Sequence, residues 1–167
     1  MNRTKAGDRN EIVVTGVGSV TRYGVGTEAL WNAATKEAEA SSRDDYKLNG
    51  FKPVKHISDR RMMKAISKID AIGLAAFETA VKESRVEDKD YEKERMGVYV
   101  GSPAASAYDN VEYMDSQRAA DGDIKKFGST CMTSRPTTLL LGLPNNVLCY
   151  GSLVLDARGP NDNYTSG

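Results

Sequence analysis

The sequence predicts an α/β fold, in which strands and helices alternate along the chain. Two short apolar runs, residues 11–16 (EIVVTG) and 96–101 (MGVYVG), are rich in β-branched residues, end at a glycine and are typical of buried strands. Between them, apolar residues recur at steps of three and four over residues 62–80, which predicts an amphipathic helix. Strand, helix and strand in this order favour the α/β class, and a length of 167 residues fits one domain.

The first strand is followed by a predicted loop and a predicted helix. Glycines interrupt residues 17–26, so we expect a loop there. Thr27 is suited to cap a helix over residues 28–36, because a threonine hydroxyl accepts a hydrogen bond from a free N–H group of the first turn. The next residues, up to about Ser58, carry scattered charges and Pro53, and we expect them to run over the surface.

The helix over residues 62–80 has the clearest pattern in the chain. We expect Ser58 or Asp59 to cap it, since both residue types favour that position. Its small residues Gly73 and Ala76 would let a neighbouring element approach closely.

The last third of the chain is strongly apolar. We expect a helix over residues 106–119, a loop over residues 121–134 and an apolar helical stretch from Pro136 onward. Residues 139–157 are more hydrophobic than a surface helix requires, because a surface helix keeps a polar face. We therefore expect this stretch to be buried on most sides, which a body of 167 residues would not easily achieve alone.

The charge balance argues against two classes of partner. Lys plus Arg and Asp plus Glu each number 23, and the net charge is zero, whereas a nucleic-acid or membrane-surface binder usually carries a basic face or tail. The polar first ten residues lack the apolar stretch of a secretory signal, and no run of eighteen apolar residues is present. We therefore expect a cytoplasmic protein with free thiols that binds neither nucleic acid nor a membrane.

The individual sequence motifs predict neither a cofactor site nor a metal site. The pair Gly16 and Gly18 follows a strand, but Thr21 stands where a dinucleotide-binding loop has its third glycine, so we expect no nucleotide cofactor. The one histidine, His56, sits in a polar stretch, and two cysteines have no metal-binding spacing. We expect Cys149 to be a small buried residue of the apolar helix and Cys131 to lie in a loop, neither of them catalytic.

Four segments, in order, resemble the β-ketoacyl-acyl-carrier-protein synthases, a family with the thiolase fold. The opening EIVVTGVGSVTRYGVGTEALWNAA is similar to the first strand, glycine loop and first helix of the family. Residues 60–80 resemble the helix that follows a basic pair, and residues 97–102 resemble the central strand that ends in Gly-Ser. Pro144 and Asn145, followed by the turn at residues 158–160, match the helix and turn before the nucleophile strand.

The sequence also departs from the family. Counted without gaps from Gly159 and Pro160, the nucleophilic cysteine of the family falls one position after Gly167. A gapped alignment instead places Tyr164 on the cysteine position. In either alignment the chain carries no matching nucleophile, and the two histidines that the family uses for decarboxylative condensation belong to the second half of its longer chains. The resemblance therefore implies no catalytic residue in this chain.

The resemblance further implies a fold and two sites. The fold is a thiolase-like N-terminal half, a single domain over residues 1–167 with a mixed sheet and covering helices, which a C-terminal ketosynthase chain would complete. The residues after the Gly-Ser of the family line its acyl pocket, and here these are Pro103, Ala104 and Ala105. The strand before the nucleophile lies at the dimer interface of the family. Here that interface strand comprises Asn161, Asp162, Asn163, Tyr164 and Thr165.

Two functions and one origin of the chain remain open. We favour a chain-length-factor-like subunit of a type II fatty acid or polyketide synthase, which pairs with a ketosynthase and works with an acyl carrier protein. In the alternative, this chain and a separate C-terminal chain together form one active synthase protomer. Self-cleavage after Gly167 would be compatible with either function, because a chain that ends at Ser166 and Gly167 on a nucleophile elbow resembles hydrolases that cleave themselves before a Ser, Thr or Cys.

Overall fold

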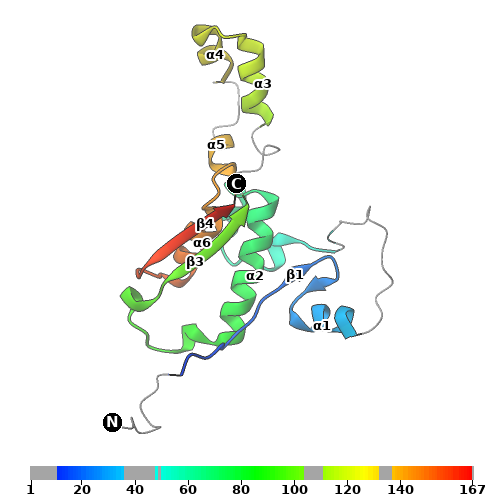
Figure 1. The fold of residues 1–167 in the computed structure, drawn as a ribbon, viewed down its shortest axis with the longest axis vertical. Coiled ribbons are helices and arrows are strands. Elements are labelled where there is room, and N and C mark those ends of the chain that lie inside the picture. Colours follow the sequence, from blue (N-terminus) through cyan, green and yellow to red (C-terminus); the bar gives the residue numbers. More distant parts are fainter. Residues whose placement is uncertain (1–10, 36–47, 49, 104–110, 132–136, 167) are drawn as a thin grey trace, which may run out of the picture.

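The computed structural model describes residues 11–35, 48, 50–103, 111–131 and 137–166. Its centre is a layered unit in which helix α6 (Asn146–Leu155) packs on helix α2 (Lys68–Ser84) and on a two-stranded sheet (Figure 1). The sheet consists of the parallel strands β3 (Val98–Pro103) and β4 (Asn161–Ser166). Strand, helix and parallel strand in this arrangement confirm the predicted α/β class.

Helix α2 carries the predicted apolar face but begins later than predicted. Residues Met62–Lys64 form a separate 3₁₀ turn, and the helix starts after Ser67. The Ser67 hydroxyl accepts the Asp70 N–H (3.1 Å), and the Asp70 carboxylate accepts the Ser67 N–H (2.9 Å). This reciprocal capping box satisfies two free donors of the first turn and fixes the start of the helix at Ser67, so the prediction that Ser58 or Asp59 caps it was wrong.

Small residues let α6 approach α2 closely. A side-chain carbon added at Gly73 of α2 would lie 2.9 Å from a methyl group of Val147, and one at Gly151 of α6 would lie 3.3 Å from the Phe77 ring. The expected close approach at Gly73 is therefore confirmed. Beneath this contact, Leu74 has no exposed surface. The cluster of buried apolar side chains around it comprises Ile57, Ile66, Ala71 and Leu74.

Among the described residues, helix α6 covers one face of the sheet and leaves the other face open. Val98 is buried, while its neighbour Tyr99 is 62% exposed, because successive side chains of a strand point to opposite faces. Helix α6 contacts both strands, so we infer that it covers the face to which Val98 belongs. The predicted strand over residues 96–101 is thus confirmed as a strand, but it begins and ends two residues later, at Val98 and Pro103, and its burial holds for one face.

The predicted loop over residues 17–26 contains a small hairpin. Strands β1 (Val20–Thr21) and β2 (Gly24–Val25) pair antiparallel, and helix α1 (Thr27–Thr35) follows directly, as the sequence predicted. Gly24 has a positive φ of 137°, a conformation that side chains other than hydrogen rarely allow. Strand β1 lies against α2 (Figure 1).

The prediction of a buried strand over residues 11–16 was wrong for this structure. The segment belongs to no strand, and Ile12 is fully exposed. It runs along α2, where side chains at Gly16 and Gly18 would collide with carbonyl groups of that helix. The Glu83 carboxylate accepts the Val17 N–H at 2.7 Å. Within the described residues the neighbour of this segment is helix α2 and not a strand, so the segment forms no β-sheet hydrogen bonds.

A helical hairpin replaces the loop that was predicted over residues 121–134. Helices α3 (Val111–Ala120) and α4 (Ile124–Cys131) pack on each other and project away from the central unit (Figure 1). The Asp123 carboxylate accepts the N–H groups of Lys125 (2.9 Å) and Lys126 (3.1 Å), which starts α4. The rings of Tyr113 and Phe127 meet edge to face at 5.5 Å.

The remaining helical segments are short. Helix α5 (Thr138–Leu141) precedes α6, and three further 3₁₀ turns connect the main elements. These turns are Pro53–Lys55, Val86–Asp88 and Lys93–Arg95. None of the helices in the described part of the chain is long and apolar enough to span a membrane.

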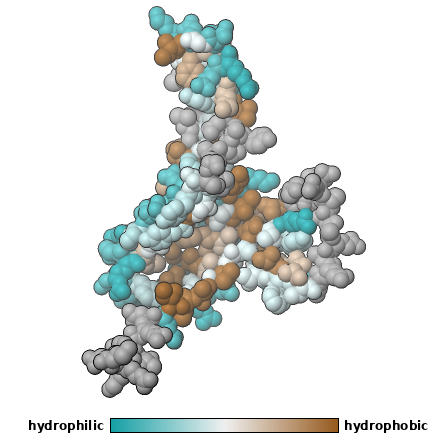
Figure 2. Space-filling model, viewed as in Figure 1, coloured by the Kyte–Doolittle hydropathy of each residue, from teal (hydrophilic) through white to brown (hydrophobic). Residues whose placement is uncertain are grey.

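The apolar stretch of the last third is buried in part. Leu148 and Gly151 face the interior, whereas Leu153 is 67% exposed. Cys149 is exposed as well, so the prediction that it is a buried residue was wrong; it lies on the outer side of α6. Figure 2 shows apolar surface over the central part of the molecule, where the helices and the unpaired first segment lie.

Candidate functional site

The carboxyl ends of β3 and β4 meet at one edge of the sheet. The two strands run parallel, with Val98 opposite Asn161 at one end and Pro103 opposite Ser166 at the other. In open α/β sheets, ligands bind outside the carboxyl ends of the strands. This edge is therefore the candidate site. Of the three predicted tunnel residues, Pro103 is the last residue of β3, while Ala104 and Ala105 lie outside the described residues.

The Ser102 side chain connects this edge to the start of α6. Its hydroxyl donates a hydrogen bond to the Pro144 carbonyl oxygen (2.8 Å) and lies 3.3 Å from the side-chain amide oxygen of Asn163 on the neighbouring strand. The end of β3, the middle of β4 and the turn before α6 are thus held together. Because the Ser102 hydroxyl donates its one proton to the Pro144 carbonyl oxygen, it has no proton left to donate to a substrate.

A buried polar network fixes the helices behind the edge. The Asn146 amide donates to the Asp70 carboxylate (3.0 Å) and to the Leu140 carbonyl oxygen (2.7 Å). Both Asn146 and Asp70 are buried. Because Asp70 also closes the capping box of α2, this one carboxylate joins the starts of α2 and α6. Asn146 and Asp70 make these hydrogen bonds within the protein, which indicates that they position the two helices and do not react with a substrate.

The open face of the sheet carries two tyrosines and an aspartate. Tyr99 pairs in register with Asp162, and Gly101 pairs with Tyr164, so these side chains share the face opposite α6. Tyr99 and Tyr164 are each 62% exposed. A hydrogen bond to Asp162 raises the pKa of Tyr164, because the neighbouring carboxylate disfavours the tyrosinate. A side chain at Gly101 would meet no atom within 4 Å, so the face is open there.

The predicted interface strand is confirmed as a strand. Asparagine and aspartate are poor strand formers, and yet all five predicted residues lie in β4. Its pairing with β3 along six positions outweighs this local preference. The role of the strand as an interface stays a prediction.

The described side chains show no nucleophile next to a base. Cys131 lies at the end of α4, where its thiol contacts the Gly128 carbonyl oxygen, and Cys149 is on the outer side of α6. His56 stacks on the Phe51 ring at 5.6 Å, which gives it a packing role. Among the described residues, no group of three His, Cys, Asp or Glu side chains could hold a metal ion.

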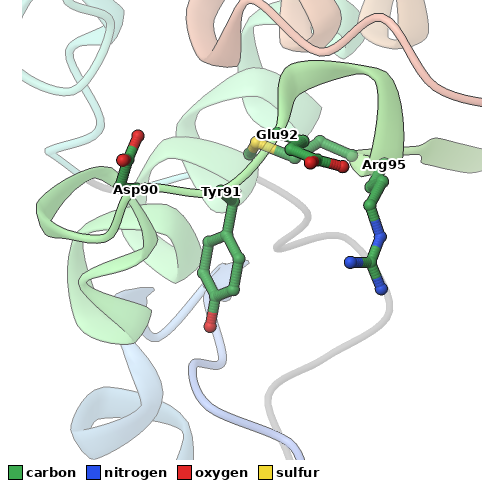
Figure 3. A pocket seen from close by; sticks show the side chains of 5 residues that line it. Asp90, Tyr91, Glu92 and Arg95 are labelled. Atoms are coloured by element: carbon green, nitrogen blue, oxygen red, sulfur yellow. The ribbon is translucent and has the colours of Figure 1, made fainter.

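One further cavity lies beside the amino end of β3, away from the candidate site. It has a volume of about 450 Å³ and is lined by Asp90, Tyr91, Glu92, Arg95 and Met96. In Figure 3 the Tyr91 and Arg95 side chains extend to one side, while the Asp90 carboxylate points to the other. The charged groups do not converge on a common point, so the cavity offers no defined place for a reacting group.

Sequence comparisons found neither a family model nor a curated protein that matches this chain. Comparison with solved structures did find similar folds. A chain of the AntDE:AntF complex, described as a type II polyketide synthase acyl-carrier protein with its ketosynthase bound to the hexaketide, matches with a TM-score of 0.67 and 23% identity over 90% of this chain and 40% of that chain.

Two other solved structures also have a similar fold over about 90% of this chain. A β-ketoacyl synthase from Burkholderia phymatum STM815 has a TM-score of 0.59 and 21% identity, over 89% of this chain and 38% of its own. The ishigamide ketosynthase/chain length factor has a TM-score of 0.64 and 17% identity, over 92% of this chain and 39% of its own. The chain thus has the thiolase-like fold of the ketosynthases and chain length factors, and spans about two fifths of their length.

Proposed function

We propose that this chain is a chain-length-factor-like subunit of a type II fatty acid or polyketide β-ketoacyl synthase. In this role it pairs with a ketosynthase and shapes the tunnel that holds the growing acyl chain. The observation that supports the proposal is the open sheet face of Tyr99, Asp162 and Tyr164, on strands of a ketosynthase-like fold. Exposed tyrosines that combine a broad apolar ring with a hydroxyl are well suited to a protein interface.

The proposed partner is a ketosynthase chain that covers this face. Tyr164→Ala would remove a ring from the centre of the proposed interface and should weaken the complex at least tenfold, as interfacial tyrosines often do. Tyr91→Ala is the matched control, because Tyr91 is also a half-exposed tyrosine but lies outside the sheet. The two dissociation constants can be compared by surface plasmon resonance with the co-purifying partner. Equal constants would contradict an interface at β4.

The proposed tunnel begins where β3 ends. Pro103 closes the strand, and Ala104 and Ala105 follow, with side chains small enough to leave space for an acyl chain. Ala104→Phe would fill this space, so the assembled synthase should release shorter products at near-normal stability. Ala119→Phe, which adds the same ring at an exposed position of α3, should leave the product length unchanged. If Ala104→Phe lowers stability and leaves the product profile unchanged, Ala104 only packs in the core.

The alternative proposal is one chain of an active β-ketoacyl-acyl-carrier-protein synthase, with cysteine and histidines on a separate C-terminal chain. It is favoured by the exposed apolar residues 12–14, which have strand character and would pair readily with strands of a complementing chain. Intact mass and N-terminal sequencing of the co-purifying protein separate the two. A full-length ketosynthase supports the chain-length-factor role, whereas a shorter chain that supplies the rest of one protomer supports the alternative.

An acyl carrier protein is the second proposed partner in either case. One similar structure is described as containing an acyl-carrier protein together with its ketosynthase. Acylated carrier protein should bind the assembled complex more tightly than this chain alone, because the tunnel opening would be complete only in the complex. Analytical ultracentrifugation with labelled carrier protein tests this order of affinities.

A further inference from the structure

A second cleft lies between the β1 hairpin and the amino-terminal half of α2. Its volume is about 510 Å³, which falls within the roughly 300–1,000 Å³ of small-molecule sites. Apolar side chains from three separate parts of the chain form its walls: Val20, Leu48, Ile69 and Ile72. Figure 2 shows apolar surface in the region where α2 and the hairpin lie in Figure 1.

Two positively charged side chains also line this apolar cleft. Arg22 and Lys68 both line it, and among the described residues no carboxylate forms an ion pair with either. The Arg22 guanidinium donates a hydrogen bond to the Tyr23 hydroxyl (2.6 Å) and lies 4.7 Å from the centre of the Tyr23 ring. These contacts hold Arg22 in place but leave its charge uncompensated. Lys68 is the first residue of α2, where the helix dipole adds positive potential.

The walls and the cations together select one type of ligand. A fully polar anion would make no apolar contact with the four apolar side chains, and a neutral hydrocarbon would form no ion pair with Arg22 or Lys68. A linear alkyl chain with a carboxylate at one end satisfies both, because the chain covers the walls and the carboxylate pairs with Arg22 and Lys68.

We propose that this cleft binds a medium- or long-chain alkyl carboxylate. The site is separate from the proposed acyl tunnel, because it is built from β1, α2 and Leu48 and contains no residue of β3 or β4. It therefore does not depend on the proposed function. Binding at this place would hold the hairpin against α2.

The test is calorimetric titration of the protein with dodecanoate below its micellar concentration. We expect saturable binding of one dodecanoate per chain. Lys68→Gln and Arg22→Gln should each weaken it tenfold or more, since each removes a charge-assisted hydrogen bond. Lys125→Gln on α4 is the matched control and should bind dodecanoate as the unmodified protein does. Uncharged 1-dodecanol should bind at least tenfold more weakly than dodecanoate.

Three results would overturn the proposal. Equal binding of dodecanoate and 1-dodecanol would mean that the cations do not take part. Unchanged binding in Lys68→Gln would mean that the carboxylate lies elsewhere, and because Lys68 is exposed this variant should fold even if Arg22→Gln does not. Loss of dodecanoate binding in Ala104→Phe would place the ligand in the acyl tunnel instead. Normal binding in Ala104→Phe, with an altered or unaltered product profile, supports the cleft independently of the tunnel.

Discussion

The contact between α2 and α6 and the segment of residues 12–14 are both apolar in sequence, but only the first is buried. Leu74 in the first region has no exposed surface, whereas Ile12 in the second is fully exposed. A helix satisfies its own backbone, so α2 needs only a surface for its apolar side, and α6 supplies one. An extended segment can be buried only if its N–H and C=O groups find hydrogen-bond partners, and no strand lies beside it in the described chain.

This difference predicts which mutations act on the chain itself and which act on its assembly. Residues between α2 and α6 stabilise the chain whether or not a partner is bound. Residues of the exposed segment and of the open sheet face contribute only when another surface covers them.

The largest effect on the chain is expected from Leu74→Ala. Loss of a fully buried leucine side chain should lower the free energy of unfolding by about 2–5 kcal/mol. Leu153→Ala on α6 is the matched control, and because Leu153 is 67% exposed its effect should stay within about 0.5 kcal/mol. Urea denaturation followed by circular dichroism measures both. Similar losses in the two variants would show that α6 is packed differently.

A smaller effect is expected from Asn146→Ala. This change removes a donor from the buried Asp70 carboxylate and should cost about 1–3 kcal/mol. Asn145→Ala, one residue earlier, removes only a 3.5 Å contact with the Cys149 sulfur and should cost much less. Denaturation of the two variants under identical conditions tests the role of the network. If they are equally stable, Asn146 does not join the two helices.

Val14→Asp should affect assembly more than folding. Val14 is largely exposed, so the free energy of unfolding of the chain alone should change by no more than about 0.5 kcal/mol. Binding of the partner should weaken tenfold or more if that partner pairs with the segment. Val54→Asp introduces the same charge at a half-exposed valine outside the segment and should not affect binding of the partner. Equal dissociation constants for both variants would mean that the segment is not part of the interface.

The smallest effect concerns the titration of Tyr164. Its pKa is raised by the hydrogen bond to Asp162, so the folded chain favours the neutral phenol. The resulting stabilisation is present below a pH of about 10 and is lost as the pH rises through the higher pKa of the folded state. Asp162→Asn should lower that pKa, and the difference in ultraviolet absorbance against Tyr164→Phe isolates the signal. Asp59→Asn, whose carboxylate pairs with Arg61, should leave the titration unchanged.

The sequence predicted best those elements whose signals are local. The periodic pattern of α2, the threonine at the start of α1 and the apolar run of β3 each specify an element, and all three are present. The start of α2 was misplaced because apolar spacing continues through the 3₁₀ turn at residues 62–64, while the capping box at Ser67 sets the boundary. In retrospect, serine followed three residues later by an acidic residue was the available signal.

Other features depend on contacts that a local pattern does not specify. Helix α4 was missed because its polar and small residues resemble a loop, and its packing against α3 supplies the stabilisation. Cys149 was expected inside because its neighbours are apolar, but which side of α6 is covered depends on the position of α2 and the sheet. The cleft at Arg22 and Lys68 is lined by residues that lie far apart in the chain, and no sequence motif predicted it.

The parallel pairing of β3 and β4 has a consequence for synthesis of the protein. Ser102 and Asn163, whose side chains are in contact across this pair, are separated by 61 positions. At about 5–20 residues per second, a ribosome needs roughly 3–12 s to deliver β4 after β3. During that interval β3 has an unpaired edge, while the α3–α4 hairpin can already fold from local contacts. Nascent chains stalled between the two strands are therefore the species on which chaperones should act, and pausing in that window should lower the yield of folded protein.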